Sequence, residues 1–169
     1  MSKKKSESPQ TIGPTRPRPR KSLAKNRKAW HEYFVEDKFE AGGSLQGSEV
    51  KAVRRGDVSL DDSYIHLDKD GNPVWINGHI REYREANRLN HEPRRTRRLL
   101  LRQAEIEKIK TAVTRKGHTA IPLELYLDGP WIKLQLGLCR GKKSWDKREV
   151  IKERESKREI GRTMRKYVS

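Results

Sequence analysis

The residues best suited to transfer protons near neutral pH are the five histidines of the chain. His91 is followed directly by Glu92, and His79 precedes both along the chain. A histidine with a nearby carboxylate can act as general acid and base when a phosphodiester bond is cleaved. Such an RNA-processing phosphodiesterase requires His79 or His91 to converge with Glu92 in a cleft, which only a structure can decide.

The spacing of the residues does not match the common motifs for metal binding or nucleotide binding. No two histidines form the H-x-x-x-H pair of a zinc site, and the chain holds a single cysteine, Cys139. Neither a G-x-x-x-x-G-K-[ST] loop nor a G-x-G-x-x-G turn is present. Cys139 follows Leu138 in an alternating apolar stretch, which favours a buried side chain over a thiol nucleophile. We therefore expect no metal, no cofactor and no internal disulfide.

Positive charge dominates the composition. Of 169 residues, 40 are Lys or Arg and 23 are Asp or Glu, which gives a net charge of +17. Residues 1–24 and residues 141–169 each carry a net charge of +6, against +5 for the whole stretch between them. A folded middle with two basic arms is typical of proteins that bind RNA or DNA.

Hydropathy argues against membrane insertion and secretion. No apolar run approaches the roughly 20 residues that cross a membrane. The first residues, MSKKK, lack the apolar stretch of a secretory signal. Together with the single cysteine, these features predict a protein of the reducing cytoplasm.

The tail, residues 141–169, combines few apolar residues with ordered charges. Glu153 precedes Lys157 by four positions, and other acidic and basic residues are three apart. Each such pair stabilises a helix by about 0.2–0.5 kcal/mol, whereas the apolar content is too low for a core. The pattern predicts a tail that is disordered alone and helical on an anionic partner. Trp145 stands isolated in it, where it either stacks on a nucleobase or packs against the folded domain.

Residues 25–140 are expected to form the only folded domain, because residues 1–24 combine four prolines with basic residues and predict a disordered arm. Alternating apolar residues predict strands, and apolar residues three or four apart predict helices. The expected elements are a strand at 30–41, a helix at 45–55 capped by Ser44 and ended by Gly56, a hairpin at 63–67 and 73–77, a loop at 81–98, a strand at 99–101, a helix at 105–116, and strands at 120–127 and 131–138.

This order of elements predicts a mainly β domain with two or three helices. About six short strands with helices at the ends suit a small closed barrel, and the oligonucleotide-binding barrel is the expected fold. An open α+β sheet is the alternative.

Four motifs, in this order, carry a resemblance to a known family. They are residues 39–42 (FEAG), residues 47–51 (GSEVK), residues 90–101 (NHEPRRTRRLLL), and the tail stretch with residues 141–143 (GKK) and 146–149 (DKRE). Together they resemble the small protein B family, the SsrA-binding proteins of bacterial trans-translation. The resemblance runs from about Lys25 to the C-terminus and leaves residues 1–24 uncovered.

The resemblance implies a noncatalytic adaptor, expected to be monomeric. It implies a barrel that binds the tRNA-like domain of transfer-messenger RNA (tmRNA, or SsrA RNA). It also implies a tail that enters the empty mRNA channel at the decoding centre of a stalled 70S ribosome. Elongation factor Tu and alanyl-tRNA synthetase are expected as indirect partners, reached through the RNA.

The same resemblance assigns roles to individual residues. The family's RNA-contacting positions fall on Glu40, Leu100 and Lys133, and on Arg102, where some members have Asn. We assign to the same RNA interface the charged residues of the second motif, Glu49 and Lys51. The residues expected in the ribosomal channel are Gly141, Lys142, Lys143, Trp145, Asp146, Lys147 and Arg148.

Individual residue types fit these roles, although each also has an ordinary explanation. A carboxylate such as Glu40 repels phosphate, yet it can accept hydrogen bonds from base amino groups. Lys133 alternates with apolar neighbours, so it is expected to point out of the barrel toward a phosphate. Either residue could instead be solvated. A permanent rRNA-binding ribosomal-type protein is the other nonenzymatic candidate, alongside the phosphodiesterase.

Overall fold

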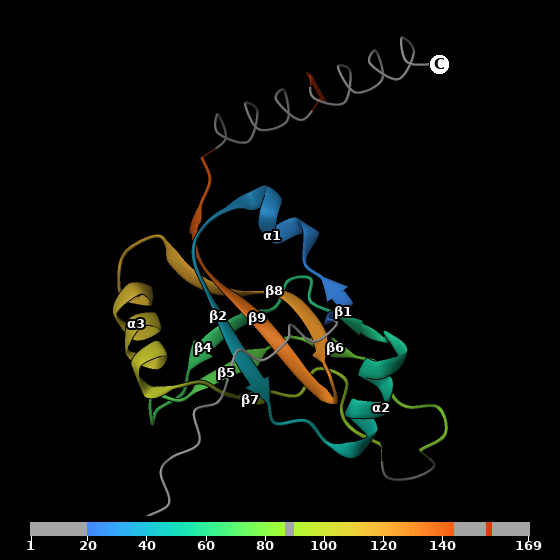
Figure 1. Cartoon of the computed structure of the whole chain (residues 1–169). Coiled ribbons are helices and arrows are strands. Elements are labelled where there is room, and N and C mark those ends of the chain that lie inside the picture. Colours follow the sequence, from blue (N-terminus) through green and yellow to red (C-terminus); the bar gives the residue numbers. More distant parts are fainter. Residues whose placement is uncertain (1–19, 87–89, 144–154, 157–169) are drawn as a thin grey trace, which may run out of the picture.

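The computed structural model describes residues 20–86, 90–143 and 155–156. Within these ranges the chain forms nine strands and three helices (Figure 1). In chain order they are β1 (Arg20–Lys25), α1 (Arg27–Glu32), β2 (Tyr33–Gly43), α2 (Gly47–Arg55), β3 (Val58–Ser59), β4 (Tyr64–Leu67), β5 (Pro73–Ile76), β6 (His79–Ile80), β7 (Arg97–Leu100), α3 (Gln103–Val113), β8 (His118–Asp128) and β9 (Trp131–Gly141).

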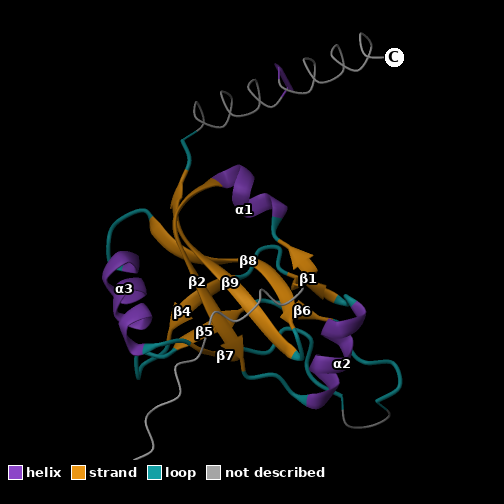
Figure 2. Ribbon diagram, viewed as in Figure 1, coloured by secondary structure: helices purple, strands orange, loops and turns teal. Residues whose placement is uncertain are grey.

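Six strands close into a ring. The order β8-β4-β5-β7-β2-β9 is completed by direct pairing of β9 with β8. Outside this ring, β1 pairs with β8, while β3 and β6 form a separate two-stranded sheet. Figure 2 shows α2 and α3 on opposite sides of the barrel, with α1 beyond one end of it. The expected closed barrel is confirmed, and the open-sheet alternative is wrong.

The three longest strands, β2, β8 and β9, form the framework of the barrel. β8 and β9 pair from His118–Arg140 to Asp128–Trp131, so only Gly129 and Pro130 separate them at the turn. Gly129 has a positive φ of +62°, a conformation that is open to glycine and strained for most other residues. The expected strands at 120–127 and 131–138 are thus confirmed and extend beyond the predicted bounds.

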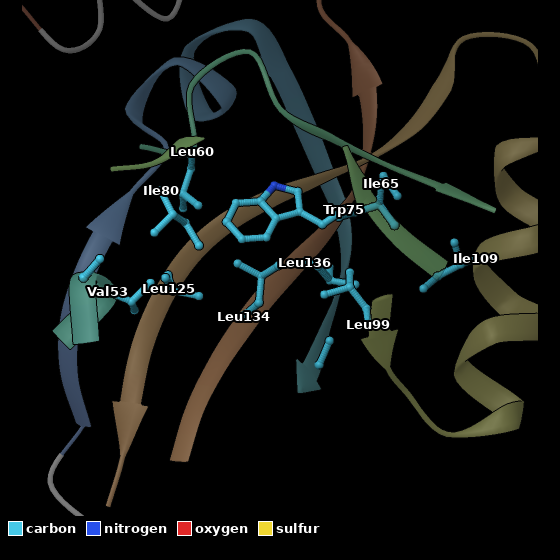
Figure 3. Packing of buried hydrophobic residues seen from close by; sticks show 13 residues of the cluster. Val53, Leu60, Ile65, Trp75, Ile80, Leu99, Ile109, Leu125, Leu134 and Leu136 are labelled. Carbon is cyan, nitrogen blue, oxygen red and sulfur yellow. The ribbon is translucent and has the colours of Figure 1, made fainter. Parts of the chain in front are cut away.

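The core fills the barrel around Trp75, of which 1% is exposed. Alternate residues of β8 and β9 pack against it, among them Leu125, Leu134 and Leu136 (Figure 3). A Cβ atom at Gly78 would lie 2.1 Å from the Trp75 indole, so only glycine fits beside the ring. Because alternate side chains enter this core, the intervening ones of the same strands are available for a surface function.

The hairpin of β4 and β5 is formed as expected. Asp68 accepts hydrogen bonds at its Oδ1 from the backbone N–H groups of Asp70 at 3.0 Å and Asn72 at 2.8 Å. Both expected helices are also present, as α2 and α3. However, α2 begins at Gly47 after an N-cap at Gln46, rather than after Ser44. Gly56 ends α2 in a left-handed conformation, as predicted.

Two segments at the start of the domain differ from expectation. The expected strand at 30–41 begins only at Tyr33. Residues 27–32 form α1, because Asn26 caps the helix by accepting a hydrogen bond from the Ala29 N–H at 2.9 Å. Residues 20–24, expected in the disordered arm, belong to β1. Their backbone pairs with residues 125–128 of β8, and Leu23 and Ala24 pack on the core.

A third difference concerns His79 and Ile80. They lie between the expected hairpin and the expected loop, and they form β6, which pairs with β3 and does not extend the hairpin. Asn77 separates β5 from β6 with a positive φ of +59°, which breaks the extended conformation. In the described part of the chain, no helix has the length and apolar character needed to span a membrane.

Candidate RNA interface

Four of the predicted RNA-contacting residues converge on one hollow of the barrel surface. The open hollow has a volume of about 470 Å³ and is lined by Glu40, Leu100, Arg102 and Lys133, together with their neighbours. Glu40 comes from β2, Leu100 from β7 and Lys133 from β9, while Arg102 is the N-cap of α3. Residues 93 positions apart in the chain are thus brought together by the closure of the barrel.

Strand register explains why the hollow forms here. Gly42 of β2 lies opposite Leu100 of β7 on one side and opposite Lys133 of β9 on the other. A residue without a side chain therefore occupies the middle of the hollow, between an aliphatic wall and a cationic wall. Glu40 is two residues from Gly42 on the same strand, so its side chain points to the same face.

Glu40 is the centre of a polar network. The Tyr126 hydroxyl donates a hydrogen bond to Glu40 Oε2, and the Lys133 ammonium donates one to Oε1. Lys133 Nζ also lies 3.0 Å from Asp128 Oδ2, and Arg20 approaches Glu40 Oε2 at 3.6 Å. These contacts hold the carboxylate in one place, although 38% of the Glu40 side chain remains exposed.

The network fixes the ionisation state of its members near neutral pH. Partial burial opposes ionisation of Glu40, but hydrogen bonds from Lys133 and Tyr126 hold its pKa below the ordinary value. Burial and the hydrogen bond to Glu40 raise the pKa of Tyr126. Hydrogen bonds to Glu40 and Asp128 raise the pKa of Lys133. The face therefore presents a carboxylate, a neutral phenol and an ammonium group.

Exposed apolar surface completes this face. Leu100 is 66% exposed and Trp131 is 65% exposed. Trp131 lies two residues before Lys133 on β9, so both side chains point to the same side of the strand. An aliphatic group, an aromatic ring, an ammonium and a hydrogen-bond acceptor are what a splayed nucleotide requires for its base, ribose and phosphate.

Sequence reasoning missed several members of this face, namely Arg20, Tyr126, Asp128 and Trp131. A usable signal was present in Asp128-Gly129-Pro130, because a two-residue turn there sets the register of β8 and β9. That register places Tyr126 opposite Lys133 and Asp128 opposite Trp131. The contribution of Arg20 had no such local signal, since it depends on the pairing of β1 with β8.

Glu49 was assigned to RNA contact, and the structure contradicts that assignment. Its side chain is 0% exposed, and its carboxylate binds the guanidinium groups of Arg95 and Arg97, each at 2.8 Å. The backbone N–H of Gln46 adds a hydrogen bond at 2.7 Å. A side chain enclosed in this way cannot reach a ligand outside the barrel, so Glu49 holds the protein's own structure together.

Arg97 is the buried partner of Glu49 and was expected to lie in a surface loop. Its side chain is 0% exposed and donates to the carbonyl oxygens of Gly78 at 2.7 Å and Pro93 at 3.0 Å. Arg97 thereby connects the segment 90–97 to α2 and to Gly78, in the connection between β5 and β6. This part of the third motif therefore has a structural role, while Leu100, at the end of the same motif, reaches the hollow.

Lys51 is exposed on α2 and is not part of the hollow. Its ammonium lies 5.3 Å from the centroid of the Tyr83 ring, and the Arg55 guanidinium lies 4.6 Å from the same ring. The structure thus groups Lys51 with Arg55 of the same helix and with Tyr83 of the expected loop at 81–98. Its assignment to RNA contact stays a prediction about a second, separate surface.

The residues of the catalytic alternative do not converge. His91 is buried, with Nδ1 2.9 Å from Ser48 Oγ and Nε2 3.1 Å from the Ile80 carbonyl oxygen. Both ring nitrogens are therefore engaged, and neither faces a cleft. His79 instead lines a shallow hollow with Asp61, Asp62 and Arg94. Cys139 is fully buried, and burial raises the pKa of its thiol to about 11, which leaves it unreactive.

The base of the predicted tail is anchored at the far end of β2 and β9. Gly141 pairs with Tyr33, and the backbone N–H of Lys142 donates to the Glu32 carbonyl oxygen at 2.9 Å. The Lys142 ammonium also donates to the Trp30 carbonyl oxygen at 3.0 Å. Lys143 is the last residue described before the break. Trp145, Asp146, Lys147 and Arg148 lie outside the described residues, so their predicted roles stay predictions.

Comparison with known proteins identifies the family. The model of the family described as SmpB protein matches residues 23–166. The SsrA-binding protein of Bacillus cytotoxicus is 47% identical over 146 residues, which cover 86% of this chain and 93% of that protein. The SsrA-binding protein of Oceanobacillus iheyensis is 42% identical over 148 residues, or 88% and 96% of the two chains.

A solved structure agrees with these relatives. The match, described as "tmRNA-SmpB: a journey to the center of the bacterial ribosome", has a TM-score of 0.62 and 37% sequence identity. It covers 75% of this chain and 92% of the matched chain. The barrel, the motifs and the relatives agree, and the chain belongs to the SmpB family.

Proposed function

We propose that this protein is an RNA-binding adaptor of trans-translation, which binds the tRNA-like domain of tmRNA and delivers it to stalled ribosomes. The observation that carries the proposal is the convergence of Glu40, Leu100 and Lys133 on one hollow of the barrel. The relatives are named for binding SsrA, and the matched structure concerns tmRNA with SmpB in the ribosome. The membership of the chain in the family extends these partners to it.

The hollow suits the recognition of an unpaired RNA segment. Lys133 supplies a positive charge for a phosphate, and the Leu100 side chain supplies an apolar surface for a base or ribose. Glu40 uses one site on each oxygen for Tyr126 and Lys133, but a carboxylate offers about four lone-pair sites. The remaining sites can accept hydrogen bonds from base amino groups, which gives the face a preference for RNA with exposed bases.

The division of labour within the chain follows from where the hollow lies. All residues of the hollow belong to the folded domain, which begins at Arg20 in the structure and which we assign to tmRNA capture. We assign residues 141–169 to the vacant mRNA channel, where the tail becomes helical and recognises the absence of mRNA by shape and charge. An intact mRNA would fill the channel and exclude the tail.

The adaptor role requires no chemistry from this protein. Alanyl transfer and peptide-bond formation are left to the RNA, alanyl-tRNA synthetase, elongation factor Tu and the ribosome. The arrangement of His79, His91 and Glu92 gives no support to the phosphodiesterase alternative. We place the protein in the cytoplasm, because its proposed RNA and ribosomal partners act there.

The proposal is tested by recovering the full-length protein from a bacterial lysate and sequencing the RNA bound to it. Strong enrichment of tmRNA is expected, with ribosomes present in less than stoichiometric amounts. Stoichiometric ribosomal RNA without enrichment of tmRNA would favour a permanent ribosomal protein instead.

A matched pair of charge reversals locates the binding face. Lys133→Glu places a third carboxylate beside Glu40 and Asp128, so it should weaken binding to a tRNA-like-domain transcript by more than tenfold, as expected for loss of a phosphate contact plus repulsion. Lys108→Glu changes the same charge on the exposed side of α3 and should have a small effect. Equal losses would mean that binding depends on net charge alone.

A further inference from the structure

Strand β1 brings an additional cation to the RNA-binding face. Arg20 lies opposite Asp128 in the pairing of β1 with β8. Its guanidinium carbon is 5.2 Å from the centroid of the Tyr126 ring, and its Nη2 atom is 3.6 Å from Glu40 Oε2. Arg20 thus contacts two residues of the Glu40 network from outside the closed ring of strands.

Charge balance gives this contact a consequence for RNA binding. The carboxylates of Glu40 and Asp128 both lie beside the ammonium of Lys133, and carboxylates repel a phosphate. Arg20 places a second positive charge beside Glu40, which reduces this repulsion when a phosphate approaches.

The geometry of Arg20 also favours a direct contact. The Tyr126 ring lies close enough for a cation–π interaction, which restricts the long side chain before any ligand arrives. The distance of 3.6 Å to Glu40 is longer than a direct hydrogen bond, and 61% of the Arg20 side chain is exposed. A guanidinium has five N–H donors in a planar fork that matches phosphate geometry. Donors of Arg20 are therefore accessible and preorganised.

We propose that the RNA interface continues from the hollow across β8 onto β1, where Arg20 contacts a phosphate of the bound RNA. This inference rests on the proposed RNA-binding function of the hollow and extends it to a strand outside the closed ring. Arg20 has two roles in it: it binds the phosphate, and it offsets the charge of Glu40 and Asp128.

The test uses the full chain and a tRNA-like-domain transcript. Arg20→Ala should weaken binding about tenfold, the effect of losing one charge-assisted hydrogen bond. The slope of log affinity against log salt concentration should become shallower by about 0.7–0.9, as expected for one lost phosphate contact. Arg20→Lys keeps the charge but loses the planar fork, so it should recover part of the affinity and most of the slope.

Lys21→Ala is the matched control, because Lys21 is the next residue of β1, carries the same charge and points to the opposite side of the strand. It should bind the transcript nearly as tightly as the unchanged protein. Thermal unfolding of each variant checks that β1 still pairs with β8. Unchanged affinity in a folded Arg20→Ala protein, or an equal loss in Lys21→Ala, would overturn the inference. So would a loss of affinity without a change in salt slope.

The outcome also separates this inference from the proposed function. If Lys133→Glu abolishes binding while Arg20→Ala has no effect, the hollow binds RNA and only its extension onto β1 is wrong. If the unchanged protein does not bind the transcript in preference to a control RNA of equal length, the proposed function itself fails.

Discussion

Replacing Glu49 by alanine tests whether this residue serves the structure or the RNA. The substitution removes a buried carboxylate and leaves Arg97, which is 0% exposed, without its ion-pair partner. Arg97 would keep its hydrogen bonds to backbone carbonyl groups, but its charge would be uncompensated. Arg95 would lose the same partner at a position where it is partly exposed and can turn toward solvent.

The expected cost follows from this burial. Removing one member of a buried ion pair destabilises a protein by about 3–5 kcal/mol, because the other charge stays buried. For a chain of this size, 1 kcal/mol changes Tm by about 2–4 °C, so the expected decrease is about 6–20 °C. A typical free energy of unfolding is about 5–15 kcal/mol, so the variant should still fold at low temperature.

Circular dichroism of the unfolding transition measures this decrease, with Glu107→Ala as control. Glu107 is an exposed carboxylate on α3, and its loss should change stability by less than about 0.5 kcal/mol. The folded Glu49→Ala protein should bind the tRNA-like-domain transcript within about twofold of the unchanged protein, since Glu49 does not reach the surface. An unchanged Tm together with lost RNA binding would refute the structural role and restore Glu49 as a contact.

The pH dependence gives an independent check. Burial raises the pKa of Glu49, but hydrogen bonds from Arg95 and the Gln46 backbone and the charge of Arg97 outweigh it and hold that pKa below the ordinary value. A carboxyl group with a lowered pKa in the folded state stabilises that state above the pKa of the unfolded chain, about 4.3. This stabilisation is lost as the pH falls through the lower folded-state pKa. The Tm difference between the unchanged protein and the Glu49→Ala variant should therefore be constant near neutral pH and should become smaller below about pH 4.

Three further predictions concern the RNA face and the tail. A chain ending at Lys143 keeps the whole of β9 and the contacts of Lys142, so it should retain specific tmRNA binding at about 0.15 M salt, measured by titration with the transcript; loss of that binding would contradict the proposed division of labour. Replacing Trp145, Asp146, Lys147 and Arg148 together by alanine should leave RNA binding intact but abolish tagging of a nascent chain on an mRNA without a stop codon; normal tagging would exclude the tail from the mechanism. Because the pKa of Glu40 is lowered and that of Lys133 is raised, transcript affinity should be constant from about pH 6 to pH 9; a titration inside this window would show that another group controls binding.

Features set by neighbouring residues could be read from the sequence. The alternation of Ile121, Leu123 and Leu125 with Pro122 and Glu124 predicted β8, and the interval between the two expected strands, residues 128–130, contains the turn into β9. Gly56 predicted the end of α2 in the same way. The hollow was reached indirectly, because Glu40, Leu100 and Lys133 were named from family motifs and the closure of the barrel then brought them together.

Features that depend on distant residues could not be read in this way. Glu49 and Arg97 are both charged, and such residues are seldom fully buried unless they are paired. Glu49 and Arg97 are 48 residues apart in the chain, so no local sequence pattern indicated that they form an ion pair with each other. The same holds for β1, whose polar residues form a strand only because β8 offers a backbone with which to pair.

The pairing of β1 has a consequence for how the barrel behaves in concentrated solution. β8 uses one side for β9, while its other side is shared: Ile65 of β4 pairs with Ala120, and β1 pairs with the segment up to Asp128. Removing residues 20–25 would uncover unpaired N–H and C=O groups along that segment, next to the exposed Trp131. Bare strand edges with nearby apolar surface promote edge-to-edge association between molecules. By covering this edge of β8, β1 therefore also prevents aggregation. A chain shortened past Lys25 should self-associate at concentrations where the longer chain stays monomeric.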